Sequence, residues 1–377
     1  MFQTLPGGNS HMLYKQPLKE ILRTTRDYWD VAEIRPAVRK NFEKMINCRT
    51  PALGAEVYAS ETEQKIVYHT CKSRTCPSCG HRATLLWQRE QWTALPDIPY
   101  VGLCFTMPDV LWPIFRQNRN LIQDLAAIGA AAIQEWVKAR YGVRLHVLVV
   151  THTFGRHLNF HPHLHILISG GGLRESEGRW MPTLSLEKPG IMQIWREALI
   201  AYLWEALKAK ELKSDLNNES VRAILKTQYG RAWNIYIARF QSKSQFLRYA
   251  GRYIRRPPIA EHRFVSITDQ EVQFLTKDLK QKRVVKTRYS LQEFVAILAE
   301  HVPDHYRHAI RYFGLLAPRS KALTSAAFFT LLGQEKRPRP QRLSWRNSLR
   351  KYFGIDPLSD RHGEVMHWLS RRKPVAQ

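Results

Sequence analysis

The chain has 377 residues and a formal net charge of +26, because 58 Lys and Arg stand against 32 Asp and Glu. Hydrophobic residues make up 44% and aromatic residues 11%, so the chain can bury a core, and a disordered basic protein is excluded. No apolar run approaches the roughly 18 residues of a membrane helix. The length predicts two or three domains. The charge favours nucleic acid as the partner. Residues 1–16 lack the apolar core of a signal peptide, so we expect a cytoplasmic protein without a membrane partner.

The hydrophobic patterns predict short helices near the N-terminus and then an alternation of strands and helices. Helices are expected over 17–29 and 38–46, followed by a segment that contains four of the five cysteines. In chain order, the patterns then predict a strand over 100–106, a helix over 118–141, strands over 145–153 and 161–169, a helix over 190–212, a strand over 233–240 and a helix over 242–255.

This order predicts the fold class α+β, with an antiparallel sheet backed by helices, because a short turn joins the two middle strands. Three short strands (264–268, 271–276 and 283–289) and a helix over 291–300 follow. From Gln334 onward, Arg, Lys and Pro are in excess, which predicts a basic tail that contacts DNA or is poorly ordered. The predicted division is an N-terminal zinc-binding and DNA-binding module (1–95), a central domain (96–260), a strand and helix region (261–333) and the tail (334–377).

A cluster of cysteines predicts a structural zinc site. Cys71, Cys76 and Cys79 are spaced as C-x4-C-x2-C, and Cys48 lies upstream. Four thiolates satisfy the tetrahedral coordination that Zn²⁺ prefers, and a chain without a secretion signal does not favour a disulfide. The alternatives to Cys48 as fourth ligand are His69 and His81. Cys104, in an apolar strand, is expected to be a core residue.

A cluster of histidines predicts a second metal site. His163 and His165 flank Leu164 in a strand, and side chains two apart point to the same face about 6–7 Å from each other. His152 lies on the preceding strand of the hairpin, where pairing would bring it alongside. Three imidazoles with open positions suit a divalent ion that contacts a substrate oxygen. His161 ranks fourth because it precedes Pro162 at the strand edge.

Tyr249 and Tyr253 are four residues apart on a predicted helix, so both rings are expected on one face. A phenol has a pKa near 10 and becomes a nucleophile only where cations or a metal stabilise its phenolate. The pattern alone favours an aromatic pair that packs a helix on a sheet. Four arginines close to this pair are candidates for DNA contacts: Arg248, Arg252, Arg255 and Arg256.

Together these motifs resemble the HUH endonuclease superfamily, named for its His-hydrophobe-His motif, and more closely the rolling-circle insertion-sequence transposases of the IS91 type. The resemblance covers most of the chain. It rests on the cysteine module, Phe105-Thr-Met-Pro108, His152-Thr-Phe-Gly155, His161-Pro-His-Leu-His165 with the glycines at 170–172, Tyr249-Ala-Gly-Arg-Tyr253 ahead of Arg256-Pro-Pro, and Arg311-Tyr-Phe-Gly314.

The resemblance implies an HUH nuclease core in which Mg²⁺ or Mn²⁺ is held by His163, His165 and a third ligand assigned to His152. A tyrosine, Tyr249 or Tyr253, then attacks single-stranded DNA, leaving a 5′-phosphotyrosine and a free 3′-hydroxyl. Two tyrosines allow the two successive transfers of rolling-circle transposition. The implied partners are single-stranded DNA at transposon ends, target DNA and host replication proteins in the bacterial cytoplasm.

Two departures from the family pattern argue against a second zinc site. Members commonly carry an additional CxxC where residues 58–63 have none, and a C-terminal cysteine pair where residues 354–363 have none. Two other functions are compatible with parts of the pattern. A plasmid rolling-circle replication initiator or relaxase would share the histidines and a tyrosine, whereas a non-catalytic zinc DNA-binding protein would bind DNA without cleaving it.

Overall fold

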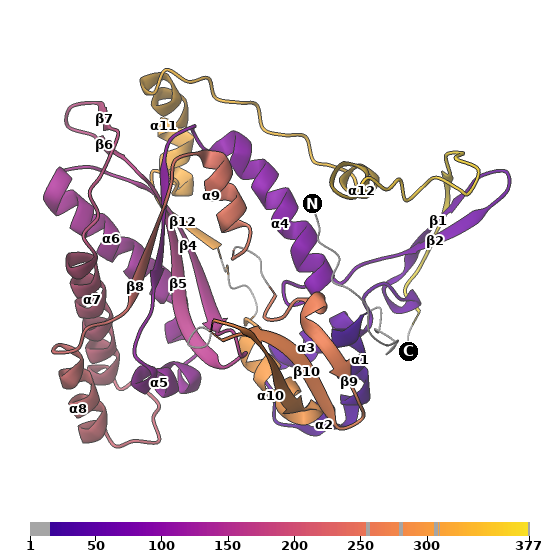
Figure 1. Cartoon of the computed structure of the whole chain (residues 1–377), viewed down its shortest axis with the longest axis horizontal. Helices are drawn as coiled ribbons and strands as arrows, with labels where there is room; N and C mark the ends of the chain where they lie inside the picture. Colours follow the sequence, from indigo (N-terminus) through magenta and orange to yellow (C-terminus); the bar gives the residue numbers. More distant parts are fainter. Residues whose placement is uncertain (1–15, 254–256, 279–281, 305–307, 309, 376–377) are drawn as a thin grey trace.

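The computed structural model describes residues 16–253, 257–278, 282–304, 308 and 310–375 (Figure 1). Residues 1–15, where no signal peptide is expected, lie outside the described residues. The predicted DNA contacts Arg255 and Arg256 also lie outside them. Within the described ranges, every helix is too short or too polar to cross a membrane.

The centre of the molecule is a five-stranded sheet in which all neighbouring strands are antiparallel. Its order is β12 (Ile310–Gly314), β4 (His146–Phe154), β5 (Phe160–Ser169), β3 (Tyr100–Phe105) and β8 (Ile235–Phe240). The predicted α+β class is confirmed. The strand order also confirms the predicted hairpin of β4 and β5, and it adds β12 beside β4.

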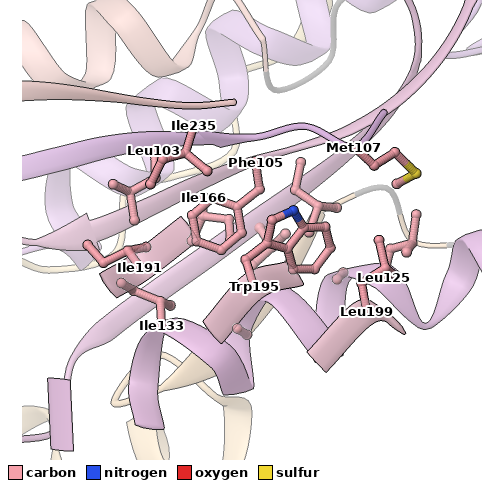
Figure 2. Close-up of a cluster of buried hydrophobic side chains, with 14 of the residues drawn as sticks. Leu103, Phe105, Met107, Leu125, Ile133, Ile166, Ile191, Trp195, Leu199 and Ile235 are labelled. Atoms are coloured by element: carbon pink, nitrogen blue, oxygen red, sulfur yellow. The ribbon is translucent and has the colours of Figure 1, made fainter. Parts of the chain in front are cut away.

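One face of this sheet is covered by helices that follow its strands in sequence. The covering helices are α5 (Trp112–Gln117), α6 (Leu125–Tyr141), α7 (Lys188–Lys208) and α8 (Asn218–Gln228). Figure 2 shows Phe105 and Ile166 of the sheet facing Trp195 of α7 and Ile133 of α6. A Cβ at Gly129 of α6 would lie 2.4 Å from Cδ1 of Leu164, so glycine allows this helix to approach β5 without displacing that side chain.

The opposite face is covered only in part. At one end, α4 (Pro77–Ala94), α9 (Lys243–Ala250) and α11 (Pro318–Leu331) lie over it (Figure 1), and the second core includes Tyr100, Leu148 and Leu167. Side chains alternate between the two faces, so the neighbours of core residues Leu164 and Ile166 point to this second face. The histidines of β4 and β5 lie on this face beyond these helices.

The N-terminal helices pack against a second sheet. The helices are α1 (Pro17–Thr24), α2 (Arg26–Val31) and α3 (Pro36–Ile46), and the sheet is β9 (Phe264–Ile267), β10 (Glu271–Lys277) and β11 (Val284–Ser290), backed by α10 (Leu291–His301). One hydrophobic cluster joins all these elements, from Leu18 and Phe42 to Phe274 and Phe294. The packing therefore crosses the predicted boundaries at 95 and 260, and the domain division stays a prediction.

The C-terminal segment returns to the N-terminal module. Strand β13 (His367–Arg372) pairs with β1 (Ala55–Ala59), which pairs with β2 (Gln64–Tyr68). Figure 1 shows residues 333–344 running from α11 to α12 (Trp345–Phe353) before this strand. Residues 345–353 and 367–372 thus form regular structure within the segment predicted to be a basic tail. A small ribbon of β6 (Gly172–Arg174) and β7 (Arg179–Met181) completes the strands.

Candidate active site and zinc site

Two neighbouring strands bring the three predicted metal-binding histidines together. His152 of β4 lies directly opposite His163 of β5, and His165 follows two residues later on the same face. The local cause is the β period: Leu164 enters the core beneath, while the imidazoles on either side face the open end of the sheet. The three rings are buried.

The spacing of these rings fits a shared metal ion. The ring centres are 5.4 Å apart for His152 and His163, 4.9 Å for His152 and His165, and 5.0 Å for His163 and His165. An ion bound by three ring nitrogens at about 2.1 Å lies about 3 Å from each ring centre, which places the centres about 5 Å apart. The ring centres are therefore spaced as three imidazoles around one divalent ion would be, whereas the ring nitrogens that lie within 4.8 Å of each other and of Cys104 are those of His163 and His165.

Hydrogen bonds to backbone carbonyls fix which nitrogen carries the proton in two of these rings. The Nδ1 of His163 donates to the carbonyl of His161, and the Nε2 of His152 donates to the carbonyl of Tyr253, both at 2.7 Å. A carbonyl oxygen only accepts, so each of these nitrogens carries the proton and the other nitrogen keeps its lone pair. Burial lowers the pKa of His163 to about 4 and holds the pKa of His152 well below its usual value, so both rings are neutral at pH 7.

Cys104 of β3 lies beside the histidines. Its sulfur and the ring nitrogens of His163 and His165 all lie within 4.8 Å of one another, a tighter group than one that includes His152. Burial raises the pKa of this thiol to about 12, and a protonated thiol is a poorer ligand for a divalent ion than a neutral imidazole, so we favour His152 as the third ligand. The expectation that Cys104 is a core residue is wrong, because the side chain is half-buried and lines the cleft.

The two tyrosines meet the histidines from the end of α9. This helix begins after Ser242, whose side chain accepts from the backbone N–H of Gln245, and it ends at Ala250 rather than at the predicted 255. Tyr249 is on the helix and Tyr253 is on the turn that follows it. The turn brings the two rings to 4.9 Å from each other and the Tyr253 ring to 4.1 Å from that of His165.

The environments of the two tyrosines differ. Tyr249 is 9% exposed, its ring lies 4.7 Å from that of Phe240, and burial, with Tyr253 beside it, raises the pKa of its hydroxyl. The ring fits because residue 102 is glycine: a Cβ there would lie 2.9 Å from Cε1 of Tyr249. Tyr253 is half-buried and is the tyrosine in ring contact with a histidine.

The predicted zinc site is formed at the start of α4. Cys76 immediately precedes the helix, Cys79 lies in its first turn, and Cys48 and Cys71 approach from the segments before it. All four sulfurs lie within 4.8 Å of one another, with 3.8 Å between Cys48 and Cys79 and 3.6 Å between Cys71 and Cys79. Tetrahedral zinc bonds of about 2.3 Å separate sulfurs by about 3.8 Å, so the cluster fits Zn²⁺.

The alternative zinc ligands have other partners. His69 contacts the carbonyl of Leu53 and the carboxylate of Glu56 through its two ring nitrogens, and the His81 ring lies against Phe353. Hydrogen bonds with Cys71 and then Cys76 lower the pKa of Cys48 to about 7, although the bond with Cys79 and burial oppose them. The sulfur of Cys48 lies within 4.8 Å of the other three and 3.8 Å from that of Cys79, so Cys48 is a suitable fourth ligand.

Comparison with known proteins identifies the family. A model described as "Transposase zinc-binding domain" matches residues 20–107, and a model described as "Putative transposase" matches residues 147–323. The chain is 30% identical over 318 residues to "Transposase for insertion sequence element IS801" of Pseudomonas savastanoi pv. phaseolicola, which covers 81% of this chain and 77% of the relative. The chain belongs to the IS91-type transposase family.

A second relative of this transposase is "Putative transposase y4qJ" of Sinorhizobium fredii, 30% identical over 303 residues and 76% of each chain. The family confirms the resemblance inferred from the motifs, the transposase function and the N-terminal zinc-binding domain. The zinc model spans all four clustered cysteines, and the other model spans the three histidines and both tyrosines. DNA is the partner that a transposase requires.

The cleft of the transposase at this cluster contains cations that the sequence analysis did not select. It has a volume of about 1140 Å³ and lies between the central sheet and the sheet of β9, β10 and β11. Arg156, Arg252, Arg263 and Lys277 line it, and none of the described lining residues is acidic. Of the predicted DNA contacts, Arg252 lies in this lining and Arg248 is exposed on α9 outside it. Arg156, Arg263 and Lys277 are dispersed in the sequence, and only the tertiary fold brings them to the cleft.

Proposed function

We propose that this transposase nicks and rejoins single-stranded DNA at the ends of its insertion sequence through a 5′-phosphotyrosine intermediate, which drives rolling-circle transposition. The observation that carries the proposal is the 4.1 Å separation between the ring of Tyr253 and that of His165, which belongs to a triangle of three buried imidazoles. DNA binding alone does not require a tyrosine hydroxyl beside three clustered imidazoles.

Each group in the cleft has a role in this reaction. Mg²⁺ or Mn²⁺, held by His152, His163 and His165, would draw charge from a non-bridging oxygen of the scissile phosphate. The tyrosine oxygen attacks phosphorus, the bond from phosphorus to the 3′-oxygen breaks, and the departing 3′-oxygen takes up a proton. The guanidinium of Arg252 lies 5.4 Å from the centre of the Tyr249 ring and lines the cleft, where its charge would attract the phosphates of a strand at this tyrosine.

The second tyrosine extends the reaction to strand transfer. The energy of the phosphoester is kept in the tyrosine adduct, so a 3′-hydroxyl rejoins the strand without ATP. With ring centres 4.9 Å apart, Tyr249 and Tyr253 can take successive strands at one site. The four cations of the lining and the absence of acidic groups among its described residues support occupation by phosphates.

Denaturing gels test this proposal. The purified protein is incubated with 5′- and 3′-labelled single strands from both flanks of its gene, with Mg²⁺ or Mn²⁺ and with a chelator too weak to remove the zinc. We expect a metal-dependent covalent adduct on the 3′ fragment that disappears in Tyr249→Phe/Tyr253→Phe. Tyr229→Phe, at an exposed tyrosine outside the cleft, is the matched control and should keep the adduct.

Two results would overturn the proposal. Binding of all strands without any adduct would identify a non-catalytic zinc DNA-binding protein. An adduct formed only on strands from a plasmid origin, and never on strands from the flanks of the gene, would identify a replication initiator or relaxase.

A further inference from the structure

Directly paired residues across three strands of the central sheet connect His165 to an exposed tyrosine on the edge strand β8. Cys104 of β3 pairs with His165 on one side and with Tyr236 of β8 on the other. Directly paired residues share a face of the sheet, and neighbouring strands lie about 4.8 Å apart, so Tyr236 is about 10 Å from His165 on the cleft face.

The exposure of Tyr236 is not explained by packing. Its neighbours Ile235 and Ile237 alternate into the hydrophobic core, whereas Tyr236 is 63% exposed and lines the cleft. A large aromatic ring left in solvent beside a candidate active site is available to stack on a ligand.

The opposite wall of the cleft provides apolar surface. Leu275 of β10 and Val284 of β11 line the same cavity and are both exposed. Arg263 lies on this wall: its side chain donates to the carbonyl of Leu275 and to the carbonyl of Arg156. The cleft thus combines aromatic and aliphatic surface with cations, which is the composition of a site for an unpaired nucleotide.

We propose that Tyr236 is the stacking platform for a base within a few nucleotides of the cleaved phosphate, with Leu275 and Val284 facing it across the cleft. At a stacked rise of about 3.4 Å per nucleotide, the 10 Å from His165 places that base within about three nucleotides of the phosphate. Stacking needs an unpaired base and tolerates any sequence, so this subsite selects single-stranded over duplex substrate. The inference rests on the proposed function and names a positioning residue for its substrate.

The test uses 2-aminopurine, whose fluorescence is quenched by stacking. The base analogue is placed in turn at each of the three nucleotides on either side of the cleavage position, and binding is measured with full-length Tyr249→Phe/Tyr253→Phe protein, which does not cut. We expect quenching at one of these positions, retained by Tyr236→Phe and lost in Tyr236→Ala. Affinity for the single strand should fall about 5- to 150-fold in the alanine variant, while affinity for duplex stays unchanged.

Tyr229→Ala is the matched control, since Tyr229 is exposed outside the cleft and should leave quenching and affinity unchanged. Equal quenching with Tyr236→Ala, or an equal loss of duplex and single-strand affinity, would overturn the inference. The adduct assay separates the two proposals. If the unmodified protein forms no adduct, the analogue is instead moved along the whole bound strand; quenching that Tyr236→Ala abolishes would then leave the stacking subsite standing while the nuclease proposal fails.

Discussion

The substitution Gly102→Ala tests whether the position of Tyr249 depends on the absence of a side chain on β3. The new Cβ would lie 2.9 Å from Cε1 and 3.4 Å from Cζ of Tyr249, and 3.3 Å from Cε2 of Phe240. Carbon atoms pack best at about 3.5–4.0 Å, so the tyrosine ring must move by roughly 0.6–1 Å. Tyr249 is buried among the side chains of α4 and α9, so this shift is resisted, and overpacking of this kind costs about 1–3 kcal/mol.

The assay is adduct formation in a Tyr253→Phe background, where only Tyr249 can attack. A reacting group displaced by about 1 Å loses up to about 100-fold in rate, so we expect Gly102→Ala to slow the reaction about 10- to 100-fold. Urea unfolding gives the matching loss of stability. Gly230→Ala is the control, because a Cβ at that residue meets no atom within 4 Å.

A double-mutant cycle decides whether the contact is the cause. If Tyr249 is what the new methyl group meets, Gly102→Ala should cost much less free energy of unfolding in a Tyr249→Ala background. An equal cost in both backgrounds would refute the reasoning, because the destabilisation would then come from β3 itself or from Phe240.

Three further predictions concern stability and metal content. The Cys48→Ser variant should contain less zinc, measured by elemental analysis, and should melt at a lower temperature, whereas the Cys104→Ser control should keep its zinc. Equal zinc content in both variants would exclude Cys48 as a ligand. Burial lowers the pKa of His301 to about 4, below its unfolded value of about 6.5, so the unfolded chain binds more protons and stability falls as the pH drops through this window. His301→Gln should remove up to about 3 kcal/mol of that pH dependence in urea unfolding at pH 4 and 7, while exposed His157→Gln should not. Lys243 is buried, donates to the carbonyls of Trp92 and Leu95 and pairs with Asp97. Lys243→Met should therefore lower the free energy of unfolding by about 2–4 kcal/mol. A loss no greater than that of Lys226→Met, at an exposed lysine, would show that these bonds contribute little.

Much of the central sheet could be predicted because its strands carry their own signal. β3, β4, β5 and β8 are short apolar runs bounded by turn residues, and their predicted limits differ from the observed ones by at most two residues. β12 has five half-buried residues and pairs with β4 about 160 residues earlier, so no local pattern indicates it. β13 is exposed along its whole length, which removes the alternation that marks a strand.

Part of the candidate site could likewise be predicted from the sequence, and part of it could not. The spacing within the β hairpin was sufficient to group His152, His163 and His165, because pairing and alternation are local rules. The helix of the tyrosines was predicted five residues too long, since helix propensity does not reveal that the chain turns after Ala250 to set Tyr253 against His165. The cleft face of Cys104 and Tyr236 follows from the cross-strand register, which the sequence does not specify.

The pairing of β13 with β1 also has a consequence for the order of synthesis. β1 leaves the ribosome early, but its partner ends at residue 372, about 310 residues later. At about 5–20 residues per second, the nascent chain carries this unpaired strand edge for roughly 15–60 s. An open edge is a template for wrong pairings, so we expect chains halted before residue 367 to aggregate through the zinc module even where the central sheet is already complete.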